Sequence, residues 1–191
     1  MSLLEPYFAM SIPNDPEELR LAALQSYQIL YTPNEERFDR IVRMAARVFG
    51  SPIALISLVD RNRQWFKASV GLDATETPRA VSFCSHAIQE KGVFVVADAA
   101  ADPRFANNPL VTGDPNIAFY AGAPLVTPTG QALGTICVID RTPWTDFADY
   151  AKEALSDYAA AIMDWLEADR KVRELTEENA RLKAELAEKR S

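Results

Sequence analysis

The first part of the chain places apolar residues at the spacing of helices. Asn14 or Asp15 can cap a helix that has Pro16 in its first turn, and apolar residues follow at helical intervals. Helical spacing returns over residues 34–50 and ends at Gly50, a residue that readily adopts the left-handed conformation of a helix stop. The pattern predicts two helices that each bury one apolar face.

After residue 52 the apolar pattern becomes that of strands. Residues 53–59 are a continuous run rich in β-branched and aliphatic side chains, and residues 60–63 are polar and typical of a turn. Residues 64–70 mix polar and apolar positions as a strand does. Together these segments predict an antiparallel hairpin.

A second hairpin is predicted further along the chain. Residues 119–126 lead through a turn with proline and glycine into residues 133–140. Gly122 and Gly134 interrupt these strands, which predicts bulges or places where two backbones approach closely.

The segment between the hairpins is less regular. It predicts a short helix over residues 84–89 and a strand over residues 93–96. Residues 99–116 contain three prolines and several Asp and Asn residues, and they are too long for a simple connection. We expect this segment to be a functional loop, a candidate lid.

The end of the chain predicts one long helix. From about Asp146 onward neither glycine nor proline interrupts a sequence of helix formers. With Val172 at heptad position a, the a and d positions carry a mostly apolar seam. The seam residues that we expect to join two copies of the chain are Trp165, Val172, Leu175, Asn179, Leu182 and Leu186.

Asn179 is the one polar residue in the interior of this seam. An Asn at position a favours a parallel pair in fixed register, because its amide can bond to its mate and is otherwise left unpaired. Glu178 and Lys183 then face each other across a parallel pair. The sequence predicts a parallel homodimer, and the alternative is an amphipathic tail that folds back on its own domain.

Composition narrows the function. The 191 residues carry a formal charge of −7, 48% are hydrophobic, and no apolar run approaches the roughly 20 residues of a membrane span. No basic stripe suits nucleic acid, and no secretory signal is apparent. We expect a cytoplasmic protein whose partners are small molecules or proteins, without nucleic acid or membrane.

Candidate chemistry is sparse. His86 is the sole histidine and lies two residues after Cys84, a spacing that suits catalysis poorly; it either satisfies a local hydrogen bond or contacts a ligand. Cys137, in an apolar strand, favours a core role over a redox role, and the sequence leaves a disulfide with Cys84 open. Asp98 and Arg104 either orient a polar ligand or form turns. No catalytic motif or metal-ligand array appears, so we expect no enzyme activity and no metal.

Several segments together resemble the bacterial GAF domain family. The resemblance covers about residues 18–166 and is carried by residues 38–42, 53–60, 63–67, 81–88, 102–105, 119–125 and 133–140. The chain is most similar to the GAF modules that precede sensor histidine kinases and diguanylate cyclases. The resemblance implies an α+β fold, with a central antiparallel sheet, helices on one face and a small-molecule cavity on the other, followed by a long C-terminal coiled-coil helix.

The chain departs from the patterns of two GAF subfamilies, which narrows the classes of ligand that the resemblance implies. Bilin-binding relatives have a Cys directly followed by His, whereas Ser85 separates Cys84 from His86 here, and the cyclic-nucleotide pattern is not evident. Neither bilin nor cyclic nucleotide is therefore supported as cofactor. Free methionine-sulfoxide reductases are GAF enzymes with several cysteines, so a thiol-dependent reductase is an alternative to be weighed.

The sequence thus predicts a flexible lead-in over residues 1–13, a GAF sensory domain over residues 14–166 and a coiled-coil signalling helix over residues 167–191. We expect the domain to bind a small ligand and to transmit its state through this helix to a histidine kinase, a diguanylate cyclase or another effector domain or partner protein. The expected ligand-binding residues are Phe83, His86, Asp98, Arg104, Phe105 and Tyr120, with the aromatic side chains as walls and His86 and Arg104 as anchors of a polar group. A ligand-free module that only dimerises is the alternative.

Overall fold

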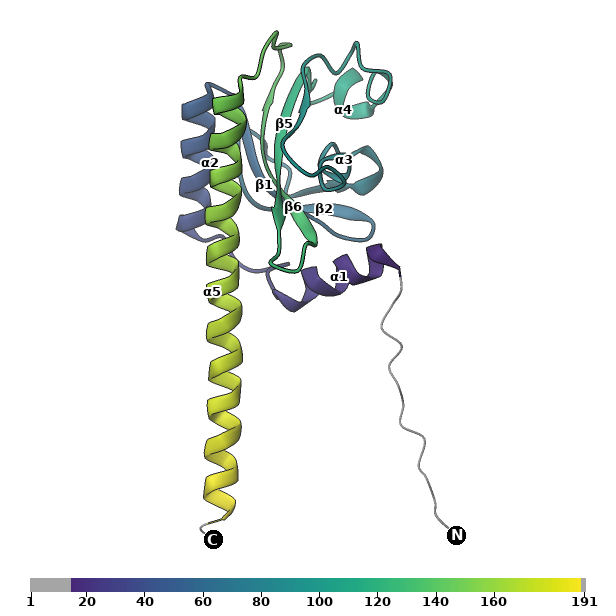
Figure 1. Ribbon diagram of the computed structural model, residues 1–191. Coiled ribbons are helices and arrows are strands. Elements are labelled where there is room, and N and C mark those ends of the chain that lie inside the picture. The colour runs from purple at the N-terminus through teal and green to yellow at the C-terminus, as the bar shows by residue number, and fades with distance from the viewer. Residues whose placement is uncertain (1–14, 190–191) are drawn as a thin grey trace, which may run out of the picture.

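The centre of the fold is a six-stranded antiparallel sheet with the strand order β3-β2-β1-β6-β5-β4 (Figure 1). The computed structural model describes residues 15–189, and the predicted lead-in lies outside them. Both predicted hairpins are confirmed, because β1 pairs with β2 and β5 pairs with β6. The strands are β1 (Ile53–Val59), β2 (Arg63–Val70), β3 (Glu76–Pro78), β4 (Phe94–Val96), β5 (Phe119–Val126) and β6 (Ala132–Asp140).

Helices cover both faces of this sheet unequally. The long α2 and the first half of α5 lie against one face, α1 crosses one end of the sheet, and the short α3 and α4 lie on the other face (Figure 1). The helices are α1 (Pro16–Ser26), α2 (Glu36–Phe49), α3 (Cys84–Ala87), α4 (Pro109–Thr112) and α5 (Asp149–Glu188), with a 3₁₀ turn η1 (Arg79–Val81). The predicted α+β architecture with its long C-terminal helix is confirmed.

Residues predicted to begin and end the first two helices do so. The Asp15 carboxylate accepts a hydrogen bond from the N–H of Glu17 at 2.9 Å, which caps α1. Gly50 ends α2 with a φ of 66°, a conformation that residues with a side chain rarely adopt. Within residues 15–189 no helix combines the length and the apolar content needed to cross a membrane.

The sheet separates two apolar cores. Alternate residues of β6 point to opposite faces, so Ile136 and Val138 join the core under α2 and α5 while Cys137 and Ile139 join the core under α3 and α4. Every residue of β1 is buried. Burial on both faces explains why residues 53–59 read as a continuous apolar run instead of an alternating one.

Gly134 allows the two central strands to approach closely. A β-carbon at this position would lie 1.9 Å from the carbonyl oxygen of Ser57 on the neighbouring β1. The register of β1 with β2 shifts at the same place, between Ile56 and Ser57. The predicted close approach at Gly134 is therefore confirmed.

We predict that Gly134→Ala destabilises the fold by about 1–3 kcal/mol or more, because the added methyl group meets a backbone atom that cannot turn aside. Urea unfolding followed by circular dichroism measures the change. Gly92→Ala is the matched control, since nothing lies within 4 Å of a β-carbon at that position. Equal stability of the two variants would contradict this account of the central strands.

Candidate functional site

Three of the predicted ligand-binding residues form one buried aromatic cluster. Phe83 stacks on Phe105 with ring centroids 4.0 Å apart and on Tyr120 with centroids 5.3 Å apart. Each of the three residues is at most 2% exposed. They fill the space between α3 and the sheet by contacting one another, instead of standing as walls around an opening.

His86 and Arg104 lie together at the outer edge of this cluster. The His86 ring meets Phe105 edge-on at 4.9 Å, and the Arg104 guanidinium lies 5.3 Å from the same ring. Arg104 is exposed and pairs with Asp102 at 2.6 Å. Partial burial, together with the positive charge of Arg104, lowers the pKa of His86, so the imidazole is neutral at pH 7.

Asp98 has a local structural role. Its carboxylate accepts hydrogen bonds from the N–H groups of Ala100 and Ala101, at 3.0 and 3.2 Å, which form a turn after β4. The structure therefore gathers five of the six predicted residues around Phe105 and places Asp98 in the loop beside them. Within residues 15–189 no three His, Cys, Asp or Glu side chains are grouped to hold a metal ion.

A cavity of about 140 Å³ opens beside the aromatic cluster, on the same face of the sheet. It lies between β1, β2 and β6 on one side and α4 with its flanking loop on the other. None of the six predicted residues lines it. The lining residues are Ile53, Leu55, Gln64, Phe66, Leu72, Ala74, Thr77, Leu110, Asp114, Pro115, Ile117 and Ile139.

Gln64 supplies the polar part of the cavity wall. Its carbonyl oxygen accepts hydrogen bonds from the hydroxyls of Ser57 and Ser82, and its amide nitrogen donates one to Thr77 Oγ1 at 2.6 Å. An amide carries two N–H donors, and the bond to Thr77 uses one of them. The cavity is otherwise mainly apolar.

The candidate lid does cover this cavity. Leu110, Asp114, Pro115 and Ile117 of the lining belong to the loop or directly follow it, and Asn108 fastens the loop by donating to the carbonyl of Val81 at 2.9 Å. Sequence reasoning placed the loop correctly but missed the lining residues, which come from several separate elements. The spacing of two between Ile53 and Leu55 in β1, and between Gln64 and Phe66 in β2, was the available signal that each pair shares a face of the sheet.

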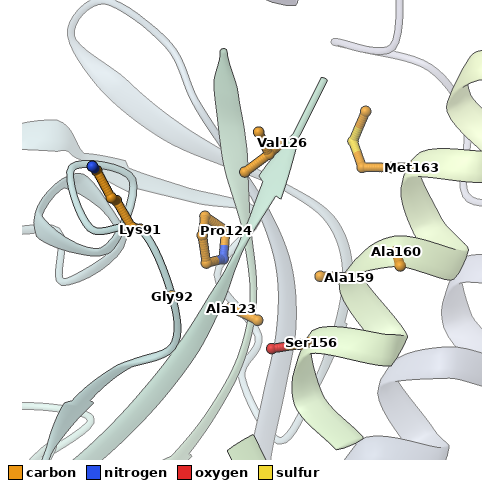
Figure 2. A pocket seen from close by; sticks show the side chains of 9 residues that line it. All are labelled: Lys91, Gly92, Ala123, Pro124, Val126, Ser156, Ala159, Ala160 and Met163. Carbon is orange, nitrogen blue, oxygen red and sulfur yellow. The ribbon is translucent and has the colours of Figure 1, made fainter. Parts of the chain in front are cut away.

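A second hollow lies on the opposite side of the sheet and has about 270 Å³ (Figure 2). Figure 2 shows its lining on three parts of the chain, with Ala123 and Pro124 on β5, Ala159 and Ala160 on α5, and Lys91 before β4. Its side chains are mostly small, and it is a more open groove than the cavity. It marks where α5 rests on the sheet through alanines.

Lys67 connects the sheet to the segment between α1 and α2. It is the extra residue of the bulge in β2, where pairing passes from Phe66 to Ala68, and the bulge turns its side chain toward the helices. The buried ammonium donates to Thr32 Oγ1 and Pro33 O and pairs with Glu35, each at 2.7 Å.

Glu35 links Lys67 to α5 through Arg37. It pairs with Arg37 at 2.6 Å, and the same guanidinium donates two hydrogen bonds to the Asp169 carboxylate on α5. Burial raises the pKa of Glu35, but the hydrogen bonds from Lys67 and Arg37 outweigh it and hold this pKa below the usual value. We call Lys67, Glu35, Arg37 and Asp169 the ionic junction.

Further contacts fasten α5 where it leaves the domain. The Tyr27 hydroxyl donates to the Glu167 carboxylate, and Arg173 donates to the carbonyl of Tyr27 at 2.8 Å. Trp165 packs edge-on against Phe38 of α2, with centroids 5.9 Å apart. Trp165, predicted to join two copies, thus has a partner within its own domain, and its role in a dimer stays a prediction.

Beyond this point α5 exposes an apolar seam. Val172, Leu175, Leu182 and Leu186 are between 47% and 63% exposed, although their side chains are large and apolar. The helix continues past the sheet without interruption (Figure 1). Most helices in proteins gain their stability by packing an apolar face, whereas within residues 15–189 this part of α5 leaves its large apolar side chains exposed.

The arrangement of sheet, helices and covered cavity defines the class of protein. The model of the GAF domain family matches residues 33–163, from just before α2 into α5, and the chain belongs to this family. The resemblance seen in the sequence is thereby confirmed.

A relative with a named activity matches most of this chain. The cyclic di-GMP phosphodiesterase PA2567 of Pseudomonas aeruginosa is 48% identical over 156 residues, which are 81% of this chain and 27% of that protein. The chain thus spans about a quarter of the relative that it matches.

Solved structures share the fold at low sequence identity. The GAF domain of an Acinetobacter phosphoenolpyruvate-protein phosphotransferase has a TM-score of 0.61 at 19% identity, covering 82% of this chain and 95% of that one. A free methionine-R-sulfoxide reductase from Neisseria meningitidis has a TM-score of 0.59 at 18% identity, covering 83% and 94%.

We predict that Arg37→Gln loosens α5 at the ionic junction and costs about 1 kcal/mol of stability, since it removes a partly buried charge from two carboxylates. Hydrogen exchange of the α5 amides around Asp169 should accelerate. The control is Arg40→Gln on the same helix, whose exposed side chain reaches Glu36 at 3.9 Å. Unchanged exchange in Arg37→Gln would show that the junction does not hold α5.

Proposed function

We propose that this chain is a cytoplasmic sensory module of a signalling protein. It binds a small, mainly apolar molecule in the cavity beside the aromatic cluster and passes its state along α5, in a parallel dimer, to an effector. The observation that carries the proposal is the course of α5, whose first half packs on the sheet and whose second half exposes a heptad seam.

The size of the cavity sets the class of ligand. An apolar cavity of roughly 150 Å³ holds one benzene molecule, and this cavity has about 140 Å³. A ring-sized molecule with one acceptor for the Gln64 amide suits it. Cyclic nucleotides and bilins are much larger than benzene, which agrees with the absence of their motifs from the sequence.

The route of the signal follows from the contacts. The lid residues over the cavity and the strands beneath it are packed in one core, and the ionic junction ties β2 to α5. A ligand changes the output only if it binds two arrangements of the domain with different affinity, a difference typically worth about 1–3 kcal/mol.

The dimer supplies the means of transmission. In two parallel copies the exposed seam would bury Val172, Leu175, Leu182 and Leu186, and the amides of Asn179 would bond across it. Small shifts of α5 at the ionic junction would then change the crossing or register of the two helices.

The effector that we propose is an enzyme of cyclic dinucleotide signalling. The relative at 48% identity is named as a cyclic di-GMP phosphodiesterase and is far longer than the part matched by this chain. A sensor histidine kinase or a diguanylate cyclase, suggested by the sequence resemblance, could receive the same helical signal.

We predict that benzene, used as the probe, binds to the cavity in a saturable way. In methyl-labelled protein, NMR signals of Ile117 and Ile139 should shift on titration because both line the cavity. Leu110→Phe should weaken binding about tenfold or more by filling the space. Cyclic GMP should produce no such shift.

The control is Val111→Phe, which places the same phenylalanine on α4, with slightly more added bulk, at a half-buried position outside the lining. It should leave benzene binding unchanged. Benzene binding of unchanged affinity in Leu110→Phe would refute this site. NMR shifts confined to residues of the aromatic cluster would also refute it. No saturable binding at all would favour a module that only dimerises.

We predict that Leu182→Glu weakens dimerisation about tenfold or more, because the seam would have to bury a carboxylate. Sedimentation of the whole chain measures the change. Ala180→Glu is the control, since it adds the same charge one position outside the a and d seam. A dimer that survives Leu182→Glu unchanged would exclude pairing through this helix.

The orientation of the pair is tested separately. Asn179→Leu should relax the parallel register or the number of chains, because the buried amide no longer selects either. Spin labels near the end of α5 report the distance between the two copies. Unchanged distances and chain number in this variant would contradict the role assigned to Asn179.

A further inference from the structure

The two cysteines of the described chain lie next to each other between α3 and the sheet. Cys84 is the first residue of α3, which packs on β6, and Cys137 belongs to β6 and faces the same core. Both thiols are free and buried. Both lie beside the same hydroxyl, because the Tyr120 hydroxyl contacts Cys84 Sγ and also lies against Gly122, the β5 residue that pairs with Cys137.

Hydroxyl groups surround this pair. The Tyr120 hydroxyl donates to Cys84 Sγ at 3.4 Å and lies 3.5 Å from Thr135 Oγ1. The phenol reaches this place because Gly122, the partner of Cys137 in β5, has no side chain; a β-carbon there would lie 2.2 Å from the hydroxyl. A buried cysteine normally behaves as a small apolar side chain, whereas here the apolar core around the thiols also holds the hydroxyls of Tyr120 and Thr135.

The environment makes the two sulfur atoms unlike. The neighbouring Cys137 thiol lowers the pKa of Cys84 most; burial raises this pKa, and the hydroxyls of Thr135, Tyr120 and Ser57 lower it further. The Cys84 thiol and burial raise the pKa of Cys137. A reactive pair needs one sulfur whose thiolate is stabilised by hydrogen-bond donors, which attacks, and a second thiol beside it, which resolves the product. Cys84 fits the first role and Cys137 the second.

We propose that Cys84 and Cys137 are an oxidation site, at which a hydroperoxide converts the two thiols into one disulfide between α3 and β6. The Cys84 sulfur attacks the peroxide, forming an S–O bond as the O–O bond breaks, and an alcohol or water leaves. The Cys137 sulfur then displaces the hydroxyl of the sulfenic acid as water, carrying away the Cys137 proton. Two sulfur atoms are oxidised and one peroxide is reduced.

The location gives the disulfide a consequence for the domain. It would tie the start of α3 to the sheet and close a loop that contains the lid and the cavity residue Leu110. Because both thiols are buried, the oxidant reaches them only when α3 opens locally, so the reaction is gated by that opening. The site therefore extends the proposed function to a response to oxidants, without depending on it.

The test is oxidation of the reduced full chain by hydrogen peroxide, without ligand or effector. We expect the intact mass to fall by two hydrogen atoms, a peptide map to show Cys84 joined to Cys137, and dithiothreitol to reverse both. Unfolded chain, in which both thiols are accessible, is the positive control for the reagent. Folded protein that keeps both thiols under conditions that oxidise the unfolded chain would overturn the proposal.

Single variants separate the two roles. In Cys137→Ser we expect a sulfenic acid on Cys84 that dimedone traps, whereas in Cys84→Ser we expect Cys137 to resist oxidation. Cys84→Ala and Cys137→Ala, checked by circular dichroism, replace any serine variant that fails to fold. Equal reactivity of the two cysteines, or disulfides formed only between chains, would refute a paired site. A negative result in these oxidation experiments would not change the interpretation of benzene binding or of dimerisation.

Discussion

A single sheet layer that is buried on both faces is the constraint on which the other features depend. Because successive residues of β6 face opposite cores, the side chains around the cavity and the thiols share one backbone with the side chains under α5. Gly134 lets β6 approach β1 so closely that a β-carbon at this position would lie 1.9 Å from the Ser57 carbonyl oxygen. In the proposed function, a displacement on the cavity side would reach the helix side through this shared backbone, since a densely packed core moves between discrete arrangements and does not deform gradually.

The helix that would carry the output changes its partner along its length. Tyr158 and Trp165, at heptad position a, pack on Phe49 and Phe38 of α2, and from Val172 onward the same position is exposed. One continuous periodic pattern thus serves packing within the domain first and is open to a second chain afterwards. The ionic junction lies at the transition, where charged groups with several partners hold α5 in addition to the apolar contact of Trp165 with Phe38.

The sequence was a good guide to elements and a partial guide to the site. Period, caps and glycines predicted both hairpins, the first two helices and the long C-terminal helix, because these depend on neighbours along the chain. The aromatic residues chosen for the site do meet, but they pack on one another, and the cavity lies beside them among residues such as Leu72 and Ile139. Which side of a cluster is left open depends on volumes contributed by many segments, and no local pattern contains that information. Likewise, the heptad spacing that predicted Trp165 as a contact between chains does not distinguish a partner in the same chain from one in another.

Gly122 shows how a strand position can govern the space beneath a loop. Its missing side chain lets the ring of Tyr120 lie flat along β5, and Phe83 and then Phe105 stack outward from that ring. The height at which α3 sits above the sheet is thereby set from below, by one absent methyl group in the middle of a strand. A side chain at Gly122 would displace the Tyr120 ring and, with it, the stack beneath α3, so that a position in the middle of a strand governs how a distant short helix packs, without a change in any loop.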